Sequence, residues 1–456
     1  MNTKRHILEK LVIGFLKALI SATFTVVEGW CWINCFNDDV PMPYYRLGHY
    51  FMLALILASY IAISKVYGAF EIGTSSATDI AFSQIITVFI WQIVCYVMFT
   101  LVSHKLLGIE IFAVMFVLFS AFGTVWAVLS DRIYYVLHKP KRTIVVYGNI
   151  DSYLSLKGIR NMDRRFNVVK TYNADKISLD ELCKKIYDVD AVFLCGVPSE
   201  YRNEVVKFCV ANDRVAYIKP KISDTIIRGG QTIQLLNIPI YRCRRAGSSY
   251  SYLFVKRIMD IVFSLVGIIV LSPLMLITSL AVKLYDGGPI FYMQQRYTKD
   301  KKLFNVIKFR SMRVDAEKDG VARLASENDD RITPVGRVLR KLRLDEMPQL
   351  FNILNGSMSV VGPRPERPEI FEQYEKEMPE FALRLQVKAG LTGYAQVYGK
   401  YNTPPYDKVQ MDLTYIANQS LAEDIKLMLL TFKIMFVSDS TEGVKDGQVT
   451  ADRKTK

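Results

Sequence analysis

Residues 331–365 read RITPVGRVLRKLRLDEMPQLFNILNGSMSVVGPRP and combine many charges with apolar helical patterns. In the segment VGRVLRKL the apolar residues recur at helical spacing while Arg337 and Arg340 fall on the other face, which predicts a basic helix. Asp345 follows at a position that fits the N-cap of a second helix, with Glu346 beside it. Unpaired N–H groups and the helix dipole favour an ionised carboxylate there, and such a group can be a nucleophile.

A stiff turn with a permanent positive charge closes this segment. A short apolar strand at 358–361 leads into the sequence GPRP at 362–365. The prolines restrict the turn and the guanidinium of Arg364 stays charged, so the turn suits phosphate binding. Taken alone, Asp345 and Glu346 could be an ordinary helix cap and first-turn acid. Their closeness in sequence to the charged turn favours a site for a phosphorylated ligand.

Ordered motifs over residues 256–436 resemble the bacterial sugar transferases, in particular the long polyprenyl-phosphate sugar-phosphate transferases that carry an N-terminal membrane bundle. The motifs are Lys256-Arg257, Asp260, Ser272-Pro273, Gly288-Pro289, Gln295-Arg296, Lys308-Phe309-Arg310-Ser311-Met312, Leu344-Asp345-Glu346, Val361-Gly362-Pro363-Arg364-Pro365 and Gly390-Leu391-Thr392-Gly393. The chain departs from the pattern at Thr298 and Lys301, where glycines are usual, and at Ala389, where proline is common. We interpret both departures as changes in loop stiffness.

The resemblance implies an enzyme that transfers a sugar 1-phosphate, with glucose or galactose as the expected sugar, from a UDP-sugar to undecaprenyl phosphate. UMP would be released, and the reaction would be the first membrane step of exopolysaccharide or capsule repeat-unit synthesis. Asp345 would form a phosphosugar-enzyme intermediate, and Glu346 would hold the cofactor magnesium. Lys308 and Arg310 are expected to be catalytic residues that stabilise charge on the phosphoryl oxygens. The expected substrate-binding residues are Arg337, Arg340, Pro363, Arg364 and Pro365.

Composition limits the chemistry. The 456 residues are 51% hydrophobic and carry a net charge of +14, which indicates a membrane component and favours anionic lipid or a phosphorylated substrate over nucleic acid. All four histidines and all seven cysteines lie before residue 244. The region with the acidic pair therefore has no Ser-His or Cys-His nucleophile system and no zinc site built from His and Cys.

The first third of the chain contains apolar segments near bilayer length. Basic residues precede the first segment and follow the last, while two aspartates follow the first, so both ends are expected to be cytoplasmic. The long first segment lacks a small-residue cleavage site, which argues against a signal peptide. We expect a multi-pass protein of the bacterial inner (cytoplasmic) membrane with its catalytic domain on the cytoplasmic face. The apolar segments are 7–36, 50–64, 80–102 and 109–129.

The expected fold class is a membrane α-helical bundle plus α/β. Residues 139–247 alternate short β-branched runs with mixed segments, which predicts a doubly wound Rossmann-like domain without the GxGxxG fingerprint of dinucleotide binding. The expected strands are 143–147, 168–172, 191–195 and 215–218. The expected domains are a four-helix transmembrane bundle at 1–138, the degenerate nucleotide-binding-like domain at 139–247, an α-rich monotopic catalytic domain at 248–438 and a polar tail at 439–456.

A further apolar run at 258–284 is interrupted by Ser272 and Pro273. Basic residues lie at both of its ends, which places the ends on one side of the membrane. Proline bends a helix, and the neighbouring hydroxyl can bind the carbonyl that proline leaves free. We therefore predict a re-entrant helix at 256–285 that dips into membrane lipid and returns, with a fifth spanning helix as the alternative.

Two other functions are compatible with parts of the sequence. A glycosyltransferase that moves only the sugar would release UDP and could use Asp329 and Asp330 as a metal site. A membrane-anchored scaffold could sense a nucleotide through the α/β domain, although this leaves the acidic pair unexplained. By default, these two aspartates and the neighbouring acidic residues are expected to form a solvated, mobile insert: Asp315, Glu317, Asp319, Glu327, Asp329 and Asp330. The oligomeric state is open, with a homodimer as one option.

Overall fold

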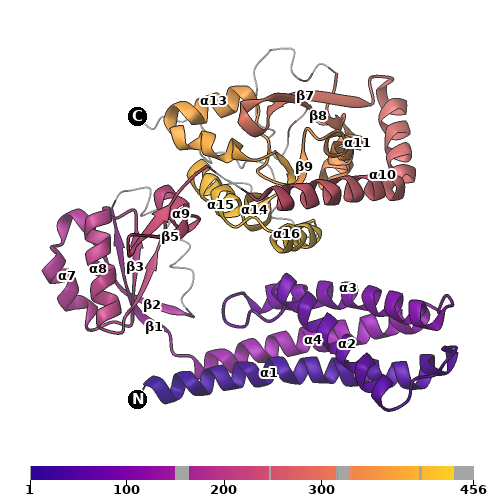
Figure 1. Cartoon of the computed structure of the whole chain (residues 1–456), viewed down its shortest axis with the longest axis horizontal. Helices are drawn as coiled ribbons and strands as arrows, with labels where there is room; N and C mark the ends of the chain where they lie inside the picture. Colours follow the sequence, from indigo (N-terminus) through magenta and orange to yellow (C-terminus); the bar gives the residue numbers. More distant parts are fainter. Residues whose placement is uncertain are drawn as a thin grey trace. The chain divides into compact units, whose positions relative to one another are not determined.

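The computed structural model describes residues 2–148, 164–245, 248–314, 316, 329, 331–399 and 403–435. The chain forms two compact units, 1–219 and 220–456, which Figure 1 shows coloured along the sequence. The boundary between the two units lies within the predicted nucleotide-binding-like domain at 139–247, so residues 220–247 belong to the second unit. The polar tail at 439–456 and most of the predicted acidic insert lie outside the described residues.

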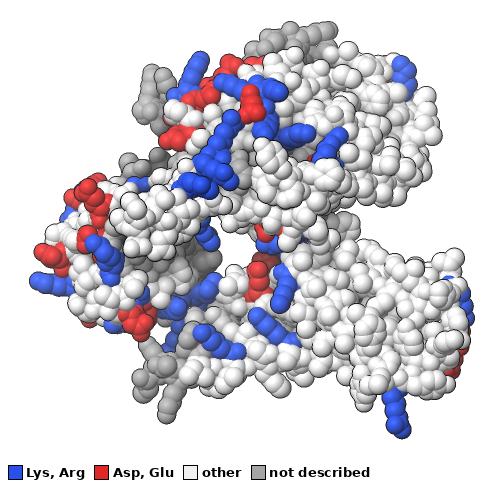
Figure 2. All heavy atoms as spheres, in the orientation of Figure 1, with Lys and Arg blue, Asp and Glu red and all other residues white. Residues whose placement is uncertain are grey.

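Unit 1 begins with a bundle of four long helices: α1 (Asn2–Cys31), α2 (Leu47–Tyr67), α3 (Ala77–Ser103) and α4 (Glu110–Leu137). A π-helical turn, Trp32–Phe36, and a 3₁₀ turn, Asn37–Asp39, extend α1. Phe24, Tyr60, Trp91 and Phe119 form one cluster of packed rings in the bundle core. In Figure 2 the visible flank of these helices is almost free of charged side chains between its two ends.

Within the described residues, five helices are long and apolar enough to cross a membrane by length and composition: α1 to α4, and α10 (Tyr250–Asp286) of unit 2. Polar contacts between the helices are buried in the bundle. Gln92 Nε2 donates to Glu28 Oε2 over 3.0 Å and joins α3 to α1. Such pairs satisfy polar groups that lipid could not. The bundle therefore has lipid-compatible outer surfaces and a partly polar interior.

The rest of unit 1 is a parallel sheet in the order β2-β1-β3-β4. The strands are β1 (Lys141–Tyr147), β2 (Phe166–Asn173), β3 (Ala191–Cys195) and β4 (Val215–Ile218), and the helices are α7 (Leu179–Ile186) and α8 (Ser199–Ala211) after a short 3₁₀ turn, Ala174–Lys176. β2 pairs with one edge of β1, and β3, the next strand in the chain, pairs with the other edge. This reversal of strand order is typical of a doubly wound sheet. The predicted strands are confirmed within two residues at each end.

Unit 2 starts with α9 (Ile222–Arg228) and a hairpin of β5 (Gln231–Leu235) and β6 (Ile238–Arg242). After α10, β7 (Phe291–Tyr297) pairs antiparallel with β8 (Leu303–Phe309) across the turn Lys299–Lys301. The core lies among the elements that follow: α11 (Pro334–Lys341), the 3₁₀ turn Leu344–Glu346, α12 (Gln349–Asn355), β9 (Ser359–Val361), α13 (Pro368–Glu377), the 3₁₀ segment Pro379–Gln386, β10 (Gly390–Thr392), α14 (Tyr394–Tyr398), α15 (Pro405–Ala417) and α16 (Leu421–Ile434).

In α10 polar residues are buried and apolar residues are exposed, which is the opposite of a helix on the surface of a soluble protein. Its buried residues include Lys256, Asp260 and Ser264, one turn apart, whereas Val270 and Ile277 are 67% and 64% exposed. A helix that hides its polar face and presents its apolar face is suited to lipid. α10 therefore packs its polar side on the protein and leaves an apolar side exposed.

Figure 1 shows that α10 bends sharply, and Pro273 is the proline within it. Proline removes the hydrogen bond to the carbonyl four residues earlier, which is that of Ile269. The hydroxyl of Ser272 donates to this carbonyl over 2.7 Å. The sequence-based prediction for the hydroxyl beside the proline is confirmed, and the bend leaves the Ile269 carbonyl satisfied.

Both limbs of α10 are attached to the same unit. Near its start, the Lys256 ammonium contacts Asp424 of α16 over 2.9 Å, and Asp260 accepts hydrogen bonds from Ser359 and Val360 of β9. At its end, Asp286 pairs with Arg310, which follows β8. A straight helix of this length would separate its ends by about 55 Å. The bend lets both ends reach one compact unit.

Candidate active site

Tight packing fixes the start of the basic helix α11. Thr333 caps α11 by accepting from the Gly336 N–H over 2.9 Å, and the Thr333 N–H donates to the Ser311 carbonyl over 3.1 Å. A Cβ on Gly336 would lie 1.9 Å from that same carbonyl, so only glycine allows this approach. The predicted helix is confirmed, with Leu339 buried and Arg337 exposed. α11 therefore presents its basic side away from the protein core.

The acidic pair lies in a different local structure from the predicted one. Arg343 adopts a left-handed conformation (φ 54°) after α11, and Asp345 and Glu346 form a 3₁₀ turn. The next helix, α12, begins at Gln349 with Pro348 in the N-cap position. The prediction that Asp345 caps a helix is wrong, because the left-handed residue starts a separate turn. Its ionisation is therefore not favoured by that helix end.

Glu346 holds two cations. Its Oε1 accepts from the Lys308 ammonium over 2.8 Å and from the Arg364 guanidinium over 2.9 Å. Burial alone would raise the pKa of Glu346, but the charges of Arg364, Lys308 and Arg343 outweigh it and hold the pKa well below its usual range. The charge of Glu346 in turn raises the pKa of Arg364. Glu346 is therefore an ionised carboxylate that joins β8 to the GPRP turn.

The pKa of Asp345 is shifted in the opposite direction from that of Glu346. Burial, followed by the charge of Glu346, raises the pKa of Asp345 to about 6, while Lys308, Arg340 and Arg364 act in the other direction. Among the residues that the structure describes, its carboxylate makes no hydrogen bond or ion pair. A partly buried carboxylate with few attachments is weakly solvated and reactive once ionised. Asp345 is thus the group of the pair that is available for chemistry.

Close backbone contacts position the GPRP turn. The Gly362 N–H donates to the Thr392 carbonyl over 2.8 Å, and the Gly390 N–H donates to the Pro363 carbonyl over 2.9 Å. A Cβ on Gly390 would lie 2.1 Å from the Gly362 nitrogen, and one on Gly393 would lie 2.1 Å from the Gly362 carbonyl oxygen. The glycines of the GLTG motif are therefore needed for β10 to reach the turn that carries Arg364.

The other predicted phosphate-contacting residues are dispersed. Arg340 lies near enough to Asp345 to affect its pKa, but Arg337 is exposed. Arg310 is buried: its donors contact Asp286 and the carbonyls of Pro289 and Met312. The structure thus brings Lys308 and Arg364 to Glu346 and leaves Arg310 holding the end of α10. Pro363 and Pro365 flank Arg364 in the turn, with Pro363 buried.

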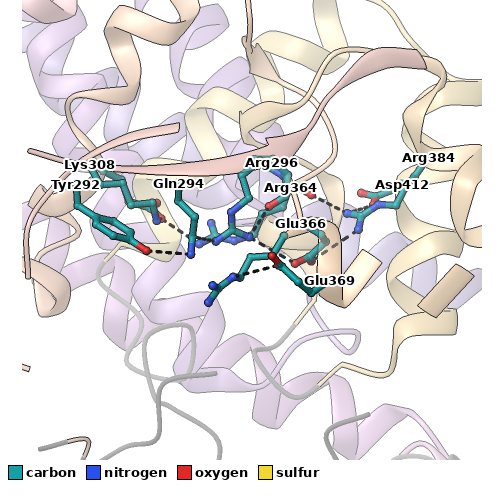
Figure 3. Close-up of polar contacts among 12 residues, drawn as sticks. Tyr292, Gln294, Arg296, Lys308, Arg364, Glu366, Glu369, Arg384 and Asp412 are labelled. Atoms are coloured by element: carbon teal, nitrogen blue, oxygen red, sulfur yellow. Dashed lines mark hydrogen bonds and ion pairs between the residues drawn. The ribbon is translucent and has the colours of Figure 1, made fainter. Parts of the chain in front are cut away.

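A second polar network extends from the GPRP turn and was missed by the sequence analysis. Arg384 and Asp412 form a buried ion pair with distances of 2.7 and 2.9 Å to the same oxygen. Arg384 Nη1 also lies 3.7 Å from Glu366 Oε1, and Arg296 Nη1 lies 3.9 Å from Glu366 Oε2. Figure 3 shows this series, from Lys308 at one end through Arg364 and Glu366 to Arg384 and Asp412. Burial lowers the pKa of Arg296 to about 10.

One sequence signal could have indicated this network. In α15, Val409, Leu413 and Ile416 mark a buried apolar face, and Asp412 lies on that face. A buried carboxylate requires a cationic or hydrogen-bonding partner. The pattern predicts such a partner, but it cannot identify Arg384, which lies in another segment.

Asp329, one of the two aspartates of the alternative metal site, already binds an arginine. Both oxygens of Asp329 accept from Arg331, over 2.8 and 2.5 Å, and Asp329 is buried. Asp330, Asp315, Glu317, Asp319 and Glu327 lie outside the described residues. Asp329 therefore has a structural partner in its own turn, and the prediction that it is a solvated residue is wrong.

The acidic pair has the chemistry of a magnesium ligand set. Within the described residues no three or more His, Cys, Asp or Glu side chains gather in a way that could hold a metal ion. Magnesium commonly binds one or two carboxylates together with substrate phosphates, so a larger cluster is not required. Both cations on Glu346 contact Oε1, and the other oxygen accepts no hydrogen bond from the described residues. Glu346 therefore fits the role of a magnesium ligand beside a bound diphosphate.

Comparison with known proteins agrees with this architecture. Residues 251–438 match the family model described as bacterial sugar transferase. Over 245 residues, the chain is 42% identical to a UDP-N-acetylgalactosamine-undecaprenyl-phosphate N-acetylgalactosaminephosphotransferase from Aeromonas hydrophila, covering 51% of this chain and 55% of the relative. Over 206 residues, it is 41% identical to the UDP-glucose:undecaprenyl-phosphate glucose-1-phosphate transferase of Escherichia coli (strain K12), covering 44% of each.

A relative from Caulobacter vibrioides is matched over more of its length. This UDP-glucose:undecaprenyl-phosphate glucose-1-phosphate transferase is 37% identical over 190 residues, which are 41% of this chain and 71% of the relative. The chain thus belongs to the bacterial sugar transferase family. It spans about half the length of the Aeromonas and Escherichia relatives.

Proposed function

We propose that this protein transfers a sugar 1-phosphate from a UDP-sugar to undecaprenyl phosphate and releases UMP. The observation that carries the proposal is the division of roles between two adjacent carboxylates. Glu346 is ionised and holds Lys308 and Arg364, whereas Asp345 has a raised pKa of about 6 and no bonded partner among the described residues. Adjacent cations and an unengaged carboxylate suit nucleophilic attack on a phosphate.

In the first step, an oxygen of ionised Asp345 attacks the phosphorus next to the sugar. A bond forms between Asp345 and phosphorus, the bridging P–O bond breaks, and UMP leaves with the bridging oxygen. In the second step, an oxygen of undecaprenyl phosphate attacks the same phosphorus and the bond to Asp345 breaks. The carboxylate is regenerated, the product is a lipid-linked sugar diphosphate, and no net proton transfer is required.

The surrounding residues prepare the site for this chemistry. Lys308 and Arg364 place positive charge beside Asp345, where the phosphoryl oxygens would gather negative charge. Glu346 would hold magnesium together with the diphosphate, and the ion would neutralise charge on the leaving UMP. Arg340 adds to the positive potential. Arg310 binds Asp286 at the end of α10 and acts on the reaction only through the fold.

We also propose that α10 is re-entrant and that the catalytic unit lies on the cytoplasmic face of the inner membrane. The support is that Lys256 and Asp286, at opposite limbs of α10, both bind the same compact unit. The apolar flank between them would lie in lipid. A UDP-sugar from the cytoplasm and a lipid phosphate could then meet at one site.

Cysteine probes can test this topology. Tyr250 and Met293, before and after α10, are 92% and 59% exposed, so each can carry a single probe in a background without the exposed Cys35 and Cys243. Both probes should resist a membrane-impermeant reagent in intact cells and react after permeabilisation. Labelling of the Met293 probe alone in intact cells would show that α10 crosses the membrane.

Product analysis tests the proposed reaction. Purified protein is incubated with undecaprenyl phosphate and UDP-glucose, UDP-galactose or UDP-N-acetylgalactosamine in turn. We expect UMP and a lipid-linked sugar diphosphate with at least one of these donors. Release of UDP with transfer of the sugar alone would identify a glycosyltransferase and refute the proposal. No product with any donor, from protein shown to bind UDP, would favour the scaffold alternative.

A further inference from the structure

The GPRP turn has few backbone N–H groups that can donate hydrogen bonds. Proline has no N–H, so Pro363 and Pro365 leave Arg364 as the one donor among these three residues. Apart from the Gly362 N–H, which donates to the Thr392 carbonyl, the turn is held through its carbonyls. The Pro363 carbonyl accepts from the Gly390 N–H, the Arg364 carbonyl from Arg384 Nη2 over 3.0 Å, and the Pro365 carbonyl from Arg296 Nη1 over 3.2 Å. Two of the three bonds therefore come from arginine side chains.

Arg384 is fixed in place by Asp412. The Arg384 side chain is 2% exposed and that of Asp412 is 1% exposed. Nε and Nη2 of Arg384 both donate to Asp412 Oδ2, and Nη2 also donates to the Arg364 carbonyl. Oδ1 of Asp412 has no hydrogen-bond partner among the described residues. The carboxylate is thus committed to Arg384, and Arg384 connects it to the turn.

Stability alone gives no reason to bury this pair. Replacing a buried ion pair by apolar residues of similar volume is often neutral or stabilising, because desolvation offsets the attraction. Arg384 already packs over Phe381, with 4.9 Å between its guanidinium carbon and the ring centre. What an apolar residue could not supply is the directed hydrogen bond to the Arg364 carbonyl. The pair therefore has a geometric role in the turn.

We propose that Arg384 and Asp412 are positioning residues that aim the Arg364 side chain at Glu346 and the substrate phosphates. This inference rests on the proposed function. Neither residue touches the reacting atoms; both act through the backbone of the turn. The half-exposed Arg364 side chain makes one hydrogen bond within the described structure, to Glu346. Because this single bond leaves the side chain loosely held, the conformation of the Arg364 backbone decides where the guanidinium points. An error of about 1 Å at such a group can lower turnover about a hundredfold.

A double-mutant cycle tests the proposal, with kcat/KM for the UDP-sugar and the Kd for UDP as readouts. Asp412→Asn keeps the shape of the side chain but removes the charge that orients Arg384. We expect it to lower kcat/KM about 10- to 100-fold and to weaken UDP binding. In an Arg364→Ala background the same change should have less than a twofold effect, because the group that it positions is gone.

Two further variants separate positioning from folding. Arg384→Lys keeps a buried cation but cannot bind Asp412 and the turn with the same fork, so it should behave as Asp412→Asn does and serves if the latter fails to fold. Asp286→Asn disrupts the Arg310 pair at the end of α10, away from the GPRP turn. Any effect of this control should be equal with and without Arg364.

The outcomes are distinct. Equal effects of Asp412→Asn in both backgrounds, in folded protein, would overturn the positioning role while leaving the proposed reaction in place. If the parent protein released no UMP, the proposed reaction would fail, and the UDP titration would still test the cycle. If the parent also bound no UDP, both proposals would be wrong.

Discussion

Replacing Asp345 by asparagine should abolish turnover and stabilise the protein. In the folded chain, burial and Glu346 raise the pKa of Asp345 from its ordinary value of 3.8 to about 6. The folded state therefore disfavours the ionised form. Stability is unaffected below the ordinary pKa, falls as pH rises toward about 6, and stays lowered above that. A pKa rise of this size corresponds to about 3 kcal/mol, or about 1–3 kcal/mol allowing for partial exposure.

Thermal unfolding in detergent over pH 4–8 measures this effect. At pH 8, Asp345→Asn should melt roughly 2–10 °C above the parent, because the neutral amide avoids the penalty. The difference should be smallest at pH 4, where Asp345 is protonated in the folded chain and about half protonated in the unfolded chain, while UMP release by the variant is lost at every pH. A pH-independent difference, or a variant that is less stable at pH 8, would refute the assigned electrostatics. Substantial UMP release by folded variant would refute the nucleophile.

Three other changes have defined outcomes. Glu346→Gln should weaken the magnesium dependence of turnover and shift the acid limb of the pH profile to lower pH, because it removes a charge that raises the pKa of Asp345; an unchanged metal titration would move the ion elsewhere. Arg310→Gln should lower the melting temperature but change the KM for UDP-sugar less than tenfold; a hundredfold loss of kcat with unchanged melting would place Arg310 in the site. Replacing Ser272 and Pro273 by leucine and alanine should straighten α10, so that a probe after it reacts from outside or the protein is lost; unchanged probe accessibility in stable protein would contradict the role of the bend.

Local patterns in the sequence predicted the elements well. The strands of unit 1, the basic helix α11 and the proline break of α10 follow from spacing and from the properties of Pro and Ser. The contact between Ser272 and the Ile269 carbonyl could be predicted because it depends on residues three apart. Local rules suffice where the determining contacts are local.

The failures occur where a single backbone conformation or a distant residue decides the outcome. The left-handed Arg343 separates the acidic pair from the preceding helix α11 and places it in a 3₁₀ turn of its own, and no residue type there required this conformation. Lys308 and Arg310 are both expected at the site, but β8 ends at Phe309 and Arg310 binds Asp286 of α10 instead. Arg384 reaches the site from a separate segment, and no local pattern specifies that contact.

The most direct measurement is the fate of Asp345 when the protein meets a UDP-sugar without undecaprenyl phosphate. Intact-protein mass spectrometry with peptide mapping should find one sugar-phosphate group on residue 345, with one UMP released per enzyme. Adding undecaprenyl phosphate should remove the group and yield the lipid product. UMP that forms only when both substrates are present, without any adduct, or an adduct on another residue, would contradict the mechanism.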